Sequence, residues 1–184
     1  MSDFVYQGGT YTKVREKLHE LLLTVGYTEE TAHLWLGGDC TEDMFKARGV
    51  ELTHNRWINR GLCTQEDLNQ GIPCTIRLTT NLAEEADYVG MYFGTLENGE
   101  MRDTRYGGLP SAIVHRGRPN ETLNIWWIVD DESHNFYGPA ILRWTLDQTW
   151  KLHEVEYVIN EKNYTRDQFV QMYEMTHLEE YTGL

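Results

Sequence analysis

The chain has 184 residues, of which 40% are hydrophobic, and its 6 Trp and 11 Tyr suffice for a core in one domain. Its 16 Lys and Arg side chains are outnumbered by 29 Asp and Glu, so the net charge is −13 at pH 7. Residues 121–184 alone carry 4 basic and 12 acidic side chains, a balance of −8. Such a surface repels a nucleic-acid backbone, so we expect no direct binding of DNA or RNA. A basic protein surface is a suitable partner.

Cysteine spacing and hydropathy indicate the compartment. Cys40, Cys63 and Cys74 form no CxxC pair, so the pattern does not predict a structural zinc site. The first residues include no basic leader, and no stretch approaches the roughly 18 consecutive apolar residues that a membrane span requires. We therefore expect a cytoplasmic protein without membrane contact.

The first 71 residues read as a mainly helical segment. Residues 11–24 carry an apolar stripe at helical spacing, and Gly26 follows as a helix end. Three Thr residues with acidic neighbours have the pattern of helix N-caps: Thr28, Thr41 and Thr64. Residues 50–58 are expected to form a strand.

From residue 72 the spacing of apolar residues changes from the helical period to every second residue, the period of a strand. The expected strands cover residues 75–79, 89–96, 112–114, 123–129, 140–146 and 155–159. Asn98-Gly99 predicts a hairpin, and Thr165 is expected to cap a final helix. The sequence therefore predicts an α+β protein: an N-terminal helical segment (1–71), then an antiparallel β meander of about five to seven strands with a C-terminal helix (72–184), sharing one core.

Two segments 101 positions apart share an Ile-Asn pair, a Thr and an apolar residue at the same spacing, each after an aromatic residue. They are Trp57, Ile58, Asn59, Thr64 and Leu68, and Tyr157, Ile159, Asn160, Thr165 and Phe169. Two further turns, Asn98-Gly99-Glu100 and Asp130-Asp131-Glu132, each lead to a Gly-containing segment before an apolar run. Repeated strand and turn patterns are typical of a scaffold.

One of these stretches resembles a known repeat unit. It runs Trp127-Ile128-Val129-Asp130-Asp131-Glu132-Ser133-His134-Asn135-Phe136-Tyr137-Gly138-Pro139-Ala140-Ile141. It is similar to a degenerate unit of MORN-variant repeat proteins, which read Asn-Gly-Lys, then His-Arg-x-Asp-Gly-Pro-Ala. Asn135 replaces the usual Arg, Tyr137 the Asp, and Asp131 a glycine. The resemblance covers about residues 90–170 and implies a repeated β-hairpin scaffold, common in bacteriophage and antitoxin-like proteins, with no catalytic residues to transfer.

Motifs for chemistry are missing from the sequence. The seven His side chains form no HExxH pattern, and the Asp130-Asp131-Glu132 run lacks the spaced ligands of an EF-hand. His134 is expected to hydrogen-bond a turn backbone. Cys63 has no Cys-His-Asn pattern around it, and Ser111 is not in a GxSxG elbow. We therefore expect no catalytic, cofactor-binding or metal-binding residues, and no cofactor.

The remaining signal is a group of aromatic residues beside the acidic excess. We expect a partner-binding surface centred on Trp126, Trp127, Asp130, Asp131 and Glu132. The expected function is a non-enzymatic, phage-encoded interaction protein that binds and modulates a host protein with a basic surface, such as a defence or nucleic-acid enzyme. One alternative is a structural or assembly protein of a virion or repeat array. Another is a small hydrolase or small-molecule binding protein with a dispersed site. The sequence leaves the oligomeric state open.

Overall fold

The computed structural model describes residues 8–53, 56–59, 64–79, 88–97, 100–117 and 119–173. The helices are α1 (Thr10–Thr24), α2 (Glu29–Trp35), α3 (Glu42–Lys46), α4 (Gln65–Asn69) and α5 (Arg166–Tyr173). The strands are β1 (Val50–Thr53), β2 (Arg56–Asn59), β3 (Thr75–Thr79), β4 (Tyr88–Tyr92), β5 (Gly94–Glu97), β6 (Glu100–Asp103), β7 (Ala112–Arg116), β8 (Thr122–Trp126), β9 (Ile128–Val129), β10 (Glu132–Ser133), β11 (Ile141–Asp147), β12 (Thr149–Ile159) and β13 (Lys162–Tyr164). This order confirms the predicted α+β class.

The main sheet is an antiparallel meander. Within the described residues it has nine strands in the order β1-β2-β3-β4-β7-β8-β11-β12-β13, while β5–β6 and β9–β10 form separate two-stranded sheets. The segment expected as one strand at 50–58 is two strands, β1 and β2, paired in the register Val50↔Asn59. The N-terminal segment therefore extends the sheet as well as supplying helices.

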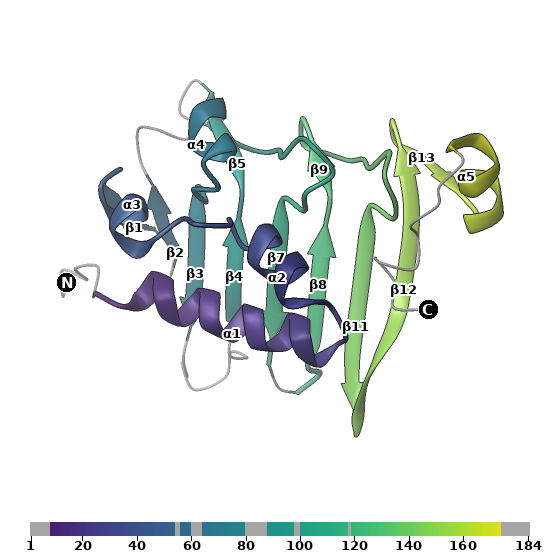
Figure 1. Ribbon diagram of the computed structural model, residues 1–184, viewed down its shortest axis with the longest axis horizontal. Coiled ribbons are helices and arrows are strands. Elements are labelled where there is room, and N and C mark those ends of the chain that lie inside the picture. The colour runs from purple at the N-terminus through teal and green to yellow at the C-terminus, as the bar shows by residue number, and fades with distance from the viewer. Residues whose placement is uncertain are drawn as a thin grey trace.

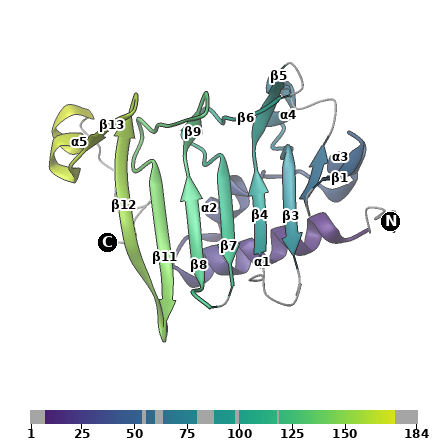
Figure 2. The ribbon, with the colours of Figure 1, turned by 180° about the vertical axis from the view of Figure 1, so that it is seen from behind.

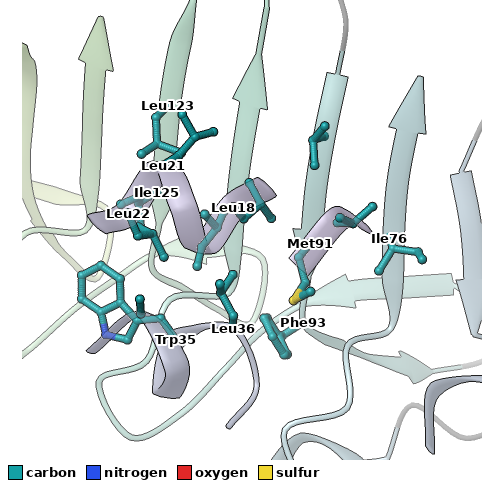
Figure 3. Close-up of a cluster of buried hydrophobic side chains, with 14 of the residues drawn as sticks. Leu18, Leu21, Leu22, Trp35, Leu36, Ile76, Met91, Phe93, Leu123 and Ile125 are labelled. Atoms are coloured by element: carbon teal, nitrogen blue, oxygen red, sulfur yellow. The ribbon is translucent and has the colours of Figure 1, made fainter. Parts of the chain in front are cut away.

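Helix α1 lies across one face of the main sheet with α2 beside it, and in the reverse view no helix of the described residues covers the opposite face (Figures 1 and 2). The predicted apolar stripe of α1 is buried: Val14, Leu18, Leu21 and Leu22 are at most 4% exposed. Figure 3 shows these leucines close to Leu123 and Ile125 of the sheet. Burying each such side chain stabilises the fold by about 1.5–3 kcal/mol, which ties the helix to the sheet.

Alternation along the strands sends one row of apolar side chains toward the helices. The strand register places these residues side by side: Ile76, Met91, Ile113, Ile125 and Leu142. All five are buried, and they belong to one cluster with side chains of α1, α2 and α3. The N-terminal helices and the sheet therefore share a core. A smaller cluster under α5 contains Tyr157, Ile159 and Phe169.

Two stretches expected as single strands are each divided at a buried aromatic residue. β4 ends before Phe93 and β8 ends before Trp127, and the chain then enters the hairpins β5–β6 and β9–β10. At both points the backbone N–H of the aromatic residue donates to a backbone carbonyl just before the next hairpin of the main sheet: Phe93 to Ser111 at 2.7 Å, and Trp127 to Ala140 at 2.8 Å. The expected continuous strands are wrong here because the chain changes its pairing partner while the apolar alternation continues.

The predicted helix caps are confirmed. The side chains of Thr28, Thr41 and Thr64 each accept a hydrogen bond from the backbone N–H three residues later. Thr165 does the same for Gln168 at 3.2 Å, at the start of α5. In both copies of the Ile-Asn-Thr pattern a strand ends near the Asn and the Thr caps a helix. The copies differ in that Asn59 ends β2, whereas Asn160 lies in a turn and β13 precedes Thr165; residues 60–63 lie outside the described residues.

Candidate interaction site

Three hairpins follow one another along one end of the main-sheet strands, where Figure 1 places β5, β9 and β13. The first two are joined by the N–H of Asp131, which donates to the carbonyl of Asp103 at 3.1 Å, and by the N–H of Arg105, which donates to the carbonyl of Ile128 at 3.0 Å. The second is joined to the end of β12 by the N–H of Asn135, which donates to the carbonyl of Val158 at 3.1 Å. These backbone bonds hold the hairpins as one continuous row.

The two adjacent tryptophans have different roles. Trp127 is 2% exposed, its Nε1 donates to the carbonyl of Gly108 at 2.9 Å, and its ring meets the ring of Trp35 edge to face at 5.3 Å. Trp126 is half-buried and pairs in register with Ala112 and Ile141. Treating both rings as partner contacts is therefore wrong for Trp127, because its ring is packed into the core. Trp126 follows the buried Ile125 along β8, so strand alternation directs its ring to the other sheet face, whereas Asp130 and Asp131 form the turn of the separate β9–β10 hairpin.

The acidic run forms the turn of the β9–β10 hairpin. Asp130 and Asp131 both have positive φ, 53° and 65°, as a two-residue type I′ turn requires. Asp131 is partly structural, because its Oδ1 accepts a hydrogen bond from the N–H of Asp103 at 2.8 Å. Asp130 accepts one from the hydroxyl of Tyr106 at 3.2 Å. Glu132 is exposed, so of the three it is the simplest to reverse without disturbing the scaffold.

Beside this turn the row of hairpins forms a pocket of about 290 Å³. One wall comes from the segment after β6, and the other comes from Trp127, β9 and the loop after β10. The lining residues are Arg105, Tyr106, Gly107, Gly108, Trp127, Val129, His134, Asn135, Phe136 and Tyr137. Tyr106, Phe136 and Tyr137 are 48%, 46% and 54% exposed, so three large rings around one pocket are open to solvent. Such a concentration of exposed aromatic surface is typical of binding sites.

Gly108 fixes the position of one pocket wall. A Cβ at this position would lie 2.9 Å from Cδ2 of Tyr137, so only a glycine allows the Tyr137 ring to lie against the backbone. The loop that carries Tyr137 is held by Asn135, whose Nδ2 donates to the carbonyl of Pro139 at 2.8 Å. The Oδ1 of Asn135 accepts the N–H of Tyr137 at 2.9 Å. The exposed rings therefore stand on an ordered backbone.

His134 connects the pocket to the next hairpin. Its Nδ1 accepts the N–H of Asn160 at 3.2 Å, which places the proton of the neutral ring on Nε2. The sequence predicted a bond to the backbone of the adjacent Gly138-Pro139 turn, whereas the bond observed is to Asn160 in the turn of the following hairpin. The ring also meets Phe136 edge to face at 4.4 Å. His134 therefore orients an aromatic wall of the pocket.

Arg105 lies behind the pocket and attaches it to α2. Its Nη1 donates to the carbonyls of Trp35 at 2.7 Å and Pro110 at 3.0 Å, and its Nη2 donates to that of Leu34 at 3.3 Å. The guanidinium also lies 3.7 Å over the Phe93 ring. Burial lowers the pKa of Arg105 to about 9. The negative end of the α2 dipole and the ring face compensate part of this desolvation.

The Nε of Arg105 has no hydrogen-bond partner and no solvent exposure. An enclosed atom does not meet a ligand in the pocket, so Arg105 acts as a structural clamp and not as an anion-binding donor. The wall that a ligand would meet is mainly aromatic.

The lining residues lack the groups of a hydrolytic site. They include no Ser, Thr or Cys nucleophile and no carboxylate. Ser111 is fully buried, and its hydroxyl donates to the carbonyl of Trp126 at 3.2 Å. His115 is bound to Glu121 at 2.9 Å, and Cys63 lies outside the described residues. Among the described residues, no three His, Cys, Asp or Glu side chains are close enough to hold a metal ion.

The sheet face opposite α1 carries a group of polar side chains. The Nε of Arg143 donates to Oδ1 of Asn124 at 2.8 Å, and its Nη1 lies 2.6 Å from Oε2 of Glu154. Glu154 in turn raises the pKa of Glu156, mainly through a side-chain hydrogen bond. These groups satisfy one another across three strands, which is the pattern of cross-strand stabilisation.

Sequence reasoning identified the acidic turn but not Tyr106, Phe136 or Tyr137. Their only sequence signal is that each aromatic residue lies next to glycine-containing turn segments. Comparison of the chain with protein-family models, curated proteins and solved structures finds no match. No helix in the described part of the chain has the length and apolar character needed to cross a membrane.

Proposed function

We propose that this chain is a non-enzymatic, cytoplasmic interaction protein that binds a basic surface of another protein. The observation that carries the proposal is the aromatic pocket beside the acidic turn: three exposed rings, Tyr106, Phe136 and Tyr137, line it, and the Tyr106 hydroxyl donates to the carboxylate of Asp130 in the turn that leads to the exposed Glu132. Exposed aromatic anchors provide most of the binding energy in protein interfaces. Carboxylates at the rim attract a basic partner and increase the association rate.

The charge of the whole chain supports the same partner class. With a net charge of −13, the molecule repels nucleic acids and attracts proteins whose surfaces normally hold them. We therefore propose a partner that is a nucleic-acid enzyme or a defence protein, inhibited by occupation of its basic surface.

A bacteriophage origin belongs to the same proposal. Its support is the resemblance of residues 127–141 to MORN-variant units and the row of hairpins joined by recurring backbone bonds. The host protein is then the target, and the host cytoplasm the compartment. A role in virion assembly predicts instead that the chain is found in purified particles, which mass spectrometry of those particles decides.

The test is affinity capture from nuclease-treated bacterial lysate with the wild-type chain and with Glu132→Lys. Glu20→Lys, which makes the same charge change on an exposed position of α1, is the matched control. We expect a basic protein that is captured by wild type and by Glu20→Lys, and much less by Glu132→Lys. Equal capture by all three chains would show that the acidic turn does not bind the partner.

A further inference from the structure

The pocket between the hairpins is small, and its walls are mainly aromatic. Its volume of about 290 Å³ lies at the lower limit of the roughly 300–1,000 Å³ that drug-sized ligands occupy. A single long side chain suits this space better than a whole metabolite. Since the enclosed Nε of Arg105 is not reachable, a group that enters meets ring faces and ring edges.

The charge at the pocket mouth is negative. The hydroxyl of Tyr106 donates to Oδ1 of Asp130 at 3.2 Å, which holds a carboxylate at the edge of an aromatic wall. Arg102 is 3.9 Å from Asp131 and offsets that second carboxylate, whereas Glu132 is exposed. Arg105 also lines the pocket, but it is buried, and three carbonyls and the Phe93 ring already surround its guanidinium. An incoming cation is therefore favoured at the rim.

From this geometry we propose that the pocket receives one arginine side chain of the partner protein; the proposal rests on the function proposed above. A guanidinium stacks on an aromatic face and still donates hydrogen bonds in its own plane, so it can contact a ring and Asp130 together. A lysine ammonium is a compact and strongly hydrated charge, which makes it a poorer match to flat aromatic walls.

The described part of the chain contains two contacts of this kind. The guanidinium of Arg105 lies 3.7 Å over the ring of Phe93, and that of Arg77 lies 3.8 Å over the ring of Tyr88. In the pocket, the exposed rings of Tyr106 and Tyr137 offer the same kind of surface, and the Tyr106 hydroxyl holds the Asp130 carboxylate beside it. An arginine of the partner can therefore form the same contact there.

The test uses three short peptides of the same sequence that differ at one central residue: arginine, lysine or citrulline. Citrulline keeps the planar shape of arginine without its charge. Binding is followed by NMR titration, with the indole N–H of Trp127 and the amides of Gly107 and Gly108 as reporters at the pocket. We expect the arginine peptide to bind tightest and to shift these signals, and the citrulline peptide to bind about two- to thirtyfold more weakly, the range of a cation–π contact.

The variants are Tyr137→Ala and Phe136→Ala, and the control is Leu146→Ala, an exposed apolar side chain on β11 that does not line the pocket. Each pocket variant should lower the affinity for the arginine peptide by about two- to thirtyfold and leave the circular dichroism spectrum unchanged. Leu146→Ala should leave the affinity unchanged. Phe136→Leu, which keeps apolar volume but removes the ring, repeats the test if truncation disturbs the fold.

Several results overturn the inference. They are equal affinity for arginine and citrulline peptides, unchanged affinity in both pocket variants, or no shift of the reporters at millimolar peptide. Binding of free arginine amide as tight as that of the peptide assigns the pocket to a small guanidinium compound and removes the partner assignment. If Glu132→Lys lowers capture of the partner while the pocket variants do not, the proposed function stands and the arginine pocket is wrong. If none of these variants lowers capture, both are wrong.

Discussion

Gly37 and Gly71 lie backbone against backbone, where the chain leaves α2 and α4. A Cβ at Gly71 would lie 2.1 Å from the carbonyl oxygen of Gly37, and a Cβ at Gly37 would lie 2.3 Å from that of Gly71. Both residues also have positive φ, 96° and 75°. This contact joins the end of α2 to the segment between α4 and β3 and leaves no space for a side chain.

Gly71→Ala should therefore unfold the protein or lower its free energy of unfolding by more than about 3 kcal/mol, because backbone must move to relieve the clash. The control is Gly26→Ala, at φ 108° with nothing within 4 Å of the added Cβ, where only backbone strain of about 1–2 kcal/mol applies. Urea unfolding of the two variants measures the difference. Equal losses would mean that the close approach does not contribute.

Thr165→Ala should lower the free energy of unfolding by about 1 kcal/mol, since its hydroxyl caps α5 by accepting the N–H of Gln168. The side chain of Gln168 returns a bond to the N–H of Thr165 at 2.9 Å, so Gln168→Ala should cause a smaller loss in the same direction. Denaturant melts provide the measurement, and Thr165→Ser, which keeps the hydroxyl, should restore most of the stability. Unchanged melts for Thr165→Ala would contradict the cap.

Arg105→Met should lower the free energy of unfolding by about 2 kcal/mol. The carbonyls of Leu34, Trp35 and Pro110 lose a buried donor, and this loss outweighs the relief from burying a charge without a carboxylate partner. The same variant should weaken peptide binding, because the pocket wall is no longer tied to α2. An increase in urea midpoint would instead show that desolvation of Arg105 dominates.

Stability should fall as pH rises above about 10. Burial raises the pKa of Tyr11 and of Tyr27, so above this pH the unfolded chain loses phenol protons that the folded chain retains. Arg105 acts in the opposite direction: burial lowers its pKa to about 9, so the folded state binds fewer protons above that value and gains stability. Above pH 10 the loss of stability from the two tyrosines is larger than the gain from the one arginine, so the free energy of unfolding decreases.

The urea midpoint between pH 8 and 11 measures this balance. Tyr27→Phe removes one of the two phenols and should flatten the fall above pH 10, whereas Tyr106→Phe, at an exposed ring, should leave the slope as in wild type. A steeper fall in Tyr27→Phe would reverse the assigned sign.

Partner binding should weaken as salt rises, mainly through slower association, because the rim charges act over the Debye length of about 10 Å at 0.1 M salt. Glu132→Lys should reduce the association rate and the salt dependence while leaving the thermal melt nearly unchanged, since Glu132 is exposed. Asp131→Lys should have a second effect that Glu132→Lys lacks. The Asp131 carboxylate accepts a hydrogen bond from the N–H of Asp103 at 2.8 Å, so its loss should also lower the melting temperature. Surface plasmon resonance over a salt series separates the two rates.

Sequence alone determined the features that depend on residues close together in the chain. The caps at Thr28, Thr41, Thr64 and Thr165 were predictable because each involves a hydroxyl and an N–H three positions later. The apolar stripe of α1 and the α+β class were predictable for the same reason, since hydrophobic period is a local property. The acidic turn at Asp130 and Asp131 also followed from local pattern.

Only the tertiary structure decided which strands pair and which side chains meet. Alternation continues unchanged through Phe93 and Trp127, so nothing local shows that the chain leaves the main sheet there. Tyr106 and Tyr137 are brought together by backbone bonds between separate hairpins, such as that from Arg105 to Ile128. Trp127 is buried by Trp35 of a helix far away in the sequence. Periodicity gives the face on which a side chain lies, but the identity of the neighbour on that face depends on strand order, which arises from packing of the whole core.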